Sequence, residues 1–103
     1  MSEYVEDVKK FAKNVDEAAV AKIVKYCGIA LKSKDSSLVS TSDKEELARV
    51  QKGFATKKLG LSADEAQAGM AAVAVRMKGV RTKSRVTFYY LLAEETKSMG
   101  KLV

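Results

Sequence analysis

Five basic residues crowd the segment 76–85, and no acidic residue lies between Glu65 and Glu94. The segment ends at an expected helix start near Ser84, where free backbone N–H groups attract anions. Similarity of 79–84 to a phosphate-binding loop is superficial, because the second glycine before Lys83 is missing and no strand is expected before it. The segment therefore suggests a site for simple anions or nucleic acid. Its candidate residues are Arg76, Lys78, Arg81, Lys83, Ser84 and Arg85.

The favoured interpretation of this segment is simpler. A solvated basic turn, in which Arg76 and Lys78 stabilise the C-terminus of the preceding helix, explains the same residues. Anion or nucleic-acid binding is the alternative.

Adjacent carboxylates occur five times and could serve general acid–base catalysis or metal binding. However, neighbouring residues on a helix point about 100° apart and do not share a site. Four of the pairs also lie in the first turns of expected helices, where negative charge complements the helix dipole. In the remaining pair, we expect Glu94 to contact Lys97 or Tyr90 on its own helix. The pairs are Glu6–Asp7, Asp16–Glu17, Glu45–Glu46, Asp64–Glu65 and Glu94–Glu95.

The residue types that most often carry catalysis are scarce. The chain has no His and one Cys, which removes the commonest general base and argues against disulfides and thiolate zinc sites. Cys27 falls on an apolar helix stripe, where a buried hydrophobe is expected. We expect no enzyme activity, no cofactor and no metal. The least favoured alternative is an enzyme that uses Tyr89, Tyr90, Glu94 and Arg85 in a pocket at a dimer interface.

A formal net charge of +6 would attract nucleic acid without specificity. Two acid-free lysine stretches could widen the basic surface. Acidic residues at the helix starts interrupt the positive field, and only four of the 19 basic residues are Arg, which argues against a dedicated binder. The aromatic residues are expected in the core or an interface rather than as stacking platforms for bases. The lysines are Lys22, Lys25, Lys32 and Lys34, then Lys52, Lys57 and Lys58, and the aromatic residues are Tyr4, Tyr26, Phe88, Tyr89 and Tyr90.

The 103 residues allow a single domain, 1–103, and the absence of proline favours helix throughout. Helices are expected after Ser2, after the run 14–17 and after Ser42, with Glu17 and Glu45 three residues beyond Asn14 and Ser42. Gly28 and Gly60 are expected to end helices. Residues 32–42 form the longest connector. The strongest start signal is Leu61, Ser62 and Glu65, a hydrophobic staple with a capping box.

The fourth expected helix is the most regular. Its apolar residues step by 4, 3, 4 and 3 positions, as in a helix packed within a bundle. Small residues beside this stripe would let a neighbouring helix approach closely. The stripe is Ala66, Met70, Val73, Met77 and Val80, and the small residues are Ala68, Gly69, Ala71 and Ala72.

The segment 86–92 is ambiguous, because its residue types favour a strand. The only other strand-like piece is Leu38–Val39, and a solitary strand leaves its backbone groups unpaired. We therefore predict a central helix from about Ser84 to Met99. A strand pair swapped across a dimer axis is the alternative.

Four motifs stand out, and they are 15–20 with 28–35, then 42–50, 57–61 and 85–94. Together they resemble a small uncharacterised bacterial family, catalogued as domain of unknown function twenty-eight fifty-three. The resemblance covers nearly the whole chain. It implies a compact all-α bundle of four to five helices, assembled as an intertwined homodimer, and it implies no activity.

The sequence thus predicts a small basic helical protein that acts by protein–protein association without catalysis. The partner would be a second copy or an unknown protein. The longest apolar runs fall well short of the ~20 residues that span a bilayer, so no membrane association is expected. The acidic start of the sequence and the single Cys favour the cytoplasm.

Overall fold

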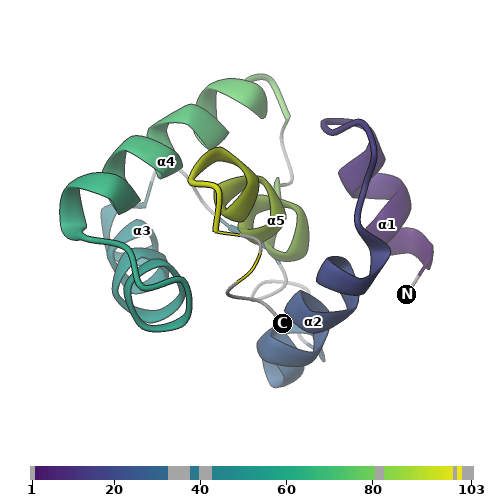
Figure 1. Cartoon of the computed structure of the whole chain (residues 1–103), viewed down its shortest axis with the longest axis horizontal. Coiled ribbons are helices and arrows are strands. Elements are labelled where there is room, and N and C mark those ends of the chain that lie inside the picture. The colour runs from purple at the N-terminus through teal and green to yellow at the C-terminus, as the bar shows by residue number, and fades with distance from the viewer. Residues whose placement is uncertain (1, 33–37, 40–42, 81–82, 99, 101–103) are drawn as a thin grey trace.

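Helix α5 (Arg85–Glu95) lies at the centre of the fold in the computed structural model, between α1 (Ser2–Lys9) and α2 (Glu17–Cys27) on one side and α4 (Ala63–Arg76) on the other (Figure 1). The structure describes residues 2–32, 38–39, 43–80, 83–98 and 100. Every residue of α5 from Val86 to Ala93 is at most 6% exposed. This burial explains why α5 has apolar residues on most sides, as predicted for a central helix.

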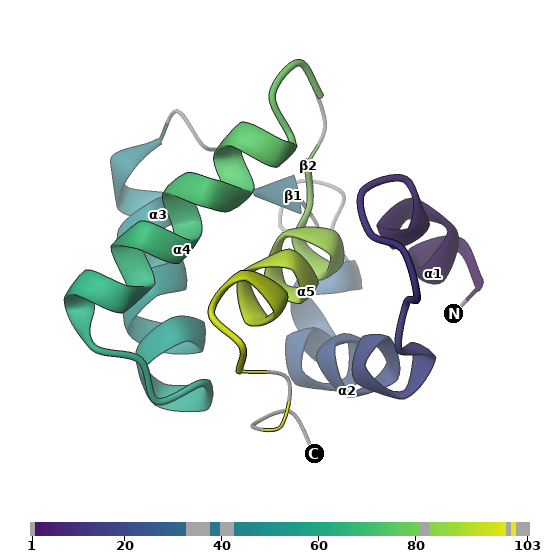
Figure 2. The same cartoon turned by 45° about the horizontal axis from the view of Figure 1, so that its top comes forward.

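Around α5 the chain adds shorter elements. A 3-10 helix η1 (Gly28–Lys32) continues α2, and α3 (Lys44–Val50) runs directly into a π-helix, η2 (Gln51–Lys58). Strand β1 (Leu38–Val39) pairs antiparallel with β2 (Lys83–Ser84), Leu38 opposite Ser84 and Val39 opposite Lys83 (Figure 2). The all-α fold class with five α-helices is therefore confirmed for the described residues.

The expectation that 86–92 is helical is confirmed, and the swapped-strand alternative is wrong. Leu38–Val39 is a strand, but its partner is Lys83–Ser84 of the same chain. Helix α5 also ends earlier than expected, at Glu95 rather than Met99. The Thr96 hydroxyl donates to the carbonyl oxygen of Leu92, and Lys97 adopts a positive φ of 56°, which ends the helix.

Local capping explains most helix boundaries. Ser62 and Glu65 form the predicted capping box of α4, and Gly60 has the predicted left-handed backbone with φ 70°. The start of α2 differs from expectation, because Asp16 rather than Asn14 accepts from the backbone N–H groups of Ala18 and Ala19.

The start of α3 and the end of α4 are also defined by the structure. Asp43 caps α3 in the same way as Asp16 caps α2, whereas Ser42 lies outside the described residues. Helix α4 ends at Arg76, so Val80 follows the helix, although the rest of the predicted stripe is buried.

The π-helix was not predicted, but the burial pattern explains it. Val50 and Ala55 are buried, as are Phe54 and Leu59, and each pair is five residues apart. Five residues on an α-helix turn the side chains about 140° out of phase. The i→i+5 repeat of a π-helix brings both pairs toward α5 and the rest of the core. The backbone N–H of Leu59 donates to the carbonyl oxygen of Phe54 at 3.0 Å, as that repeat requires.

Candidate functional site

Arg76, the first residue of the predicted basic segment, is used within the fold. Its guanidinium lies 2.6 Å from the Glu94 carboxylate and 3.6 Å from that of Glu95, and it donates to the carbonyl oxygen of Phe11 at 2.6 Å. It therefore joins the end of α4 to the end of α5 and to the turn after α1. The expectation that Glu94 would meet Lys97 or Tyr90 is wrong, because Arg76 is its partner.

Arg85 is held at the other end of α5. Its guanidinium lies 2.5 Å from the Glu46 carboxylate, and it donates to the Tyr89 hydroxyl at 3.0 Å and to the carbonyl oxygen of Leu38 at 3.4 Å. Glu46 also accepts from Arg49 at 2.9 Å. Burial raises the pKa of the Glu46 carboxyl, but the hydrogen bonds and positive charges of the two arginines outweigh burial and set it below its usual range.

The structure therefore separates residues that are close in sequence. Arg76 and Arg85 contact opposite ends of α5, which an eleven-residue helix places about 15 Å apart. Lys83 donates to the carbonyl oxygen of Val80, Ser84 precedes α5 without capping it through its side chain, and Lys78 is exposed. Arg81 lies outside the described residues. Anion or nucleic-acid binding by this segment stays a prediction.

The residues of the enzyme alternative do not gather at one place. Tyr89 accepts from Arg85, whereas the Tyr90 hydroxyl accepts from the backbone N–H of Asp16 at 2.9 Å, and Glu94 pairs with Arg76. These four side chains therefore do not form the single pocket that this alternative required.

Cys27 does not have the environment of a reactive cysteine. Burial, only partly offset by the charge of Arg85, raises the pKa of the half-buried Cys27 thiol to about 11. At neutral pH such a thiol is protonated and a poor nucleophile. Within the described ranges, no three His, Cys, Asp or Glu residues are grouped so that they could hold a metal ion. Among the helices described, none is long and apolar enough to cross a membrane.

The structure instead shows an apolar groove between the α3–η2 helix and α4, with a volume of about 260 Å³. Beside it Val75 is 72% exposed, one turn beyond Ala71, which places an apolar side chain in solvent. Of the small residues of α4, Gly69 faces α5 and does not line the groove. The contribution of α3 and η2 depends on tertiary packing, which no sequence pattern indicates. The groove is lined by Leu47, Gln51, Gln67, Met70, Ala71 and Ala74.

The outer face of α4 combines this groove with a defined charge order. The face starts with an exposed carboxylate at Asp64, is uncharged in its middle, and is followed by an exposed lysine at Lys78. The helical repeat places Asp64, Ala71 and Val75 opposite the buried stripe and Gln67 and Ala74 at its edge, whereas Lys78 follows the end of α4 at Arg76. We call it the α4 outer face, and it comprises Asp64, Gln67, Ala71, Ala74, Val75 and Lys78.

The fold and this surface define a small all-α protein with a central buried helix and an apolar groove on one flank. The chain belongs to the family described as protein of unknown function (DUF2853), whose model matches residues 3–100. The resemblance noted from the sequence motifs is thereby confirmed. No curated protein matches the chain.

Proposed function

We propose that this protein is a non-catalytic association module that binds a second copy of itself through the α4 outer face. The observation that carries the proposal is the exposure of Val75 beside an apolar groove whose lining residues carry no charge. Exposed apolar surface next to a groove is typical of protein–protein contacts.

The charge order of the α4 outer face favours a second copy over an unrelated partner. Ala71 stands midway between Asp64 and Lys78, seven residues from each. If two α4 helices pack antiparallel about a two-fold axis at Ala71, each Asp64 lies near the turn of the partner that carries Lys78, two residues after the end of α4. The surface is thus complementary to itself, as a two-fold interface requires.

The same two-fold axis would bring Val75 of each copy to the apolar groove of the other. Val75 of one copy lies opposite Gln67 of the other, at the groove between α3 and α4. Ala71 and Ala74 are small enough for the two helix backbones to approach closely. Each copy then contributes one valine and one groove.

The compactness of the chain argues for packing of outer surfaces rather than for the intertwined homodimer that the resemblance implied. Residues Val86–Ala93 of α5 are already covered by α1, α2 and α4 of their own chain. Association through α4 adds apolar burial, which a chain of this size gains from.

We also propose a cytoplasmic location, since the half-buried thiol of Cys27 suits a reducing compartment.

Sedimentation equilibrium at several protein concentrations tests the proposal. The wild-type protein is expected to form dimers, and Ala71→Glu to be monomeric, because two carboxylates would meet on the axis. Ala18→Glu, at an exposed alanine of α2, is the matched control and should remain dimeric.

A charge exchange tests the orientation of the two helices. Asp64→Lys should weaken the dimer by placing two lysines together, and adding Lys78→Glu should restore it. A monomeric wild-type protein, or a dimer unaffected by Ala71→Glu, contradicts the proposal. In the first case an unrelated protein partner would be the remaining form of association.

A further inference from the structure

Two acid-free stretches of the chain hold more positive charge than the whole protein's net charge. Residues 18–34 and 47–63 contain eight basic and no acidic residues, so the rest of the chain, with 11 basic and 13 acidic residues, is slightly acidic. The eight residues are Lys22, Lys25, Lys32 and Lys34 in the first stretch, then Arg49, Lys52, Lys57 and Lys58 in the second.

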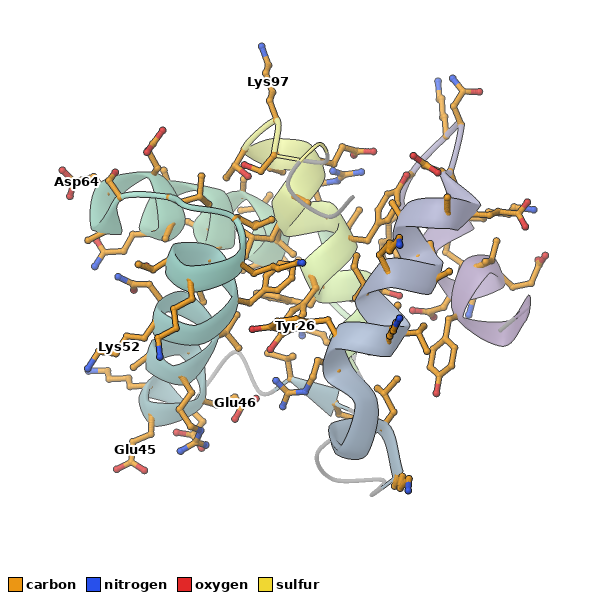
Figure 3. All side chains as sticks on the ribbon, turned by 60° about the horizontal axis from the view of Figure 1, so that its bottom comes forward. Tyr26, Glu45, Glu46, Lys52, Asp64 and Lys97 are labelled. Atoms are coloured by element: carbon orange, nitrogen blue, oxygen red, sulfur yellow. The ribbon has the colours of Figure 1, made fainter. Side chains whose placement is uncertain are left out.

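The fold brings these two stretches together at an exposed tyrosine. Tyr26 projects from α2 toward η2 (Figure 3), and its hydroxyl donates to the carbonyl oxygen of Gly53 at 3.4 Å. The Lys58 ammonium lies 6.0 Å from the centre of the Tyr26 ring, and Lys22 precedes Tyr26 by one turn on the same side of α2. We call this the Tyr26 surface, formed by Lys22, Tyr26 and Lys58.

The Tyr26 ring is both exposed and well supported. The residue is 44% exposed, so it does not lie in the core, one of the two places expected for it. The other, an interface, stays a prediction. The centres of the Tyr26 and Phe54 rings lie 5.4 Å apart in a T-shaped contact, and those of the stacked Phe54 and Tyr89 rings lie 4.0 Å apart. The aromatic contacts fix the ring while leaving part of it open to solvent.

The lysines around this ring have no carboxylate partner among the described residues. Among the described residues, Lys22, Lys25 and Lys58 form no ion pair, whereas Arg76 and Arg85 of the 76–85 segment pair with carboxylates. Within the described residues, no carboxylate therefore pairs with these lysines on the α2–η2 side.

We propose that the Tyr26 surface binds single-stranded nucleic acid, with a base stacked on the Tyr26 ring and the lysines contacting phosphates. Exposed aromatic rings flanked by lysines are how many proteins bind single strands without reading sequence. A duplex keeps its base faces stacked and cannot offer one to Tyr26. A membrane surface is disfavoured, since Tyr26 and Val75 are the exposed large hydrophobic residues in the described part of the chain, and Val75 is on α4.

Fluorescence anisotropy with a labelled oligothymidylate of about 12 nucleotides at about 150 mM salt tests the proposal. Tyr26→Ala should raise the dissociation constant about tenfold, as expected for loss of one stacked base. Tyr26→Phe keeps the ring and should bind within about twofold of wild type. Circular dichroism should show the same helix content in both variants.

Lys52 and Lys58, both in η2, distinguish a specific site from general electrostatic attraction. Lys58→Ala should weaken binding more than Lys52→Ala, because Lys52 projects from the side of η2 away from Tyr26 (Figure 3). Equal losses for the two lysines, unchanged binding by Tyr26→Ala, or equal affinity for a duplex of the same length would each overturn the proposal. Binding to vesicles of phosphatidylserine and phosphatidylcholine in equal parts, without binding to the oligonucleotide, would assign the surface to membranes instead.

Discussion

At the scale of single residues, Glu46 is the carboxylate on which the most cations converge among the ion pairs of the described residues. It holds Arg49 on its own helix and Arg85 at the start of α5, and the side chains of Glu46 and Arg85 are each 13% exposed. Partners that are this well covered interact more strongly than surface ion pairs, because less water screens them. The pair therefore fastens α3 to the central helix and, through the carbonyl oxygen of Leu38, to β1.

Because of this pair, the unfolding free energy of the protein should fall when the pH becomes acidic. The Glu46 pKa is lower in the folded protein than in the unfolded chain, so its contribution is present above the unfolded value of about 4.3 and is lost as pH falls through the folded value. Glu46→Gln should cost about 1–2 kcal/mol of unfolding free energy at pH 7 and reduce the loss of stability below about pH 4.

Urea denaturation at pH 7 and pH 3 measures both effects. Glu45→Gln, at the exposed neighbouring residue, is the control and should change stability by less than about 0.5 kcal/mol. A Glu46→Gln variant whose stability falls between pH 7 and pH 3 as much as that of the wild type would rule out this role for the carboxylate.

At the scale of elements, Gly69 decides how closely α4 approaches α5. A Cβ atom at Gly69 would lie 2.5 Å from Thr96 Cγ2 and 2.8 Å from Leu92 Cδ1, whereas one at Gly53 in η2 would meet nothing within 4 Å. Both glycines lie in helices, and neither has a positive φ. Replacing either glycine with alanine adds one methyl group, which has a steric cost at Gly69 and none at Gly53.

We expect Gly69→Ala to destabilise the protein by about 1–2 kcal/mol, because overpacking outweighs the better helix propensity of alanine. Gly53→Ala should leave stability unchanged or raise it by up to about 1 kcal/mol. Thermal unfolding of the two variants checks the opposite signs. Equal stabilisation by both would mean that Leu92 and Thr96 move aside without cost.

Contacts between residues that are close in the chain can be predicted from the sequence, whereas contacts between distant residues cannot. The Ser62–Glu65 box involves residues three positions apart, so local spacing was enough to place the start of α4. The pairing of Arg76 with Glu94 spans 18 residues and that of Arg85 with Glu46 spans 39, and only the packed fold selects those partners. The π-helix and the exposure of Tyr26 also follow from tertiary packing, and for that reason the candidate surfaces were not placed from sequence.

At the scale of the whole molecule, α5 is the helix against which most of the fold packs. Helices α1, α2 and α4 all pack against it, and the radius of gyration of 12.2 Å agrees with the roughly 13 Å expected for about 100 residues folded into one body. Helix α1 is the most weakly integrated of these partners, because it has eight residues and its outer side is exposed. Opening of α1 should therefore need less free energy than unfolding of α5.

Hydrogen exchange in the native state tests this order. Amides of α5 should exchange only through global unfolding, with a free energy equal to that from urea denaturation, and amides of α1 should exchange faster. The buried Thr87 hydroxyl donates to the Asp7 carboxylate and ties α1 to α5. Thr87→Val keeps the side-chain shape but removes this bond, and it should speed α1 exchange about fivefold, equivalent to about 1 kcal/mol. Global unfolding also breaks this bond, so α5 exchange should accelerate by the same factor while staying slower than that of α1. Unchanged exchange of α1 in Thr87→Val would show that the bond does not hold α1 against α5.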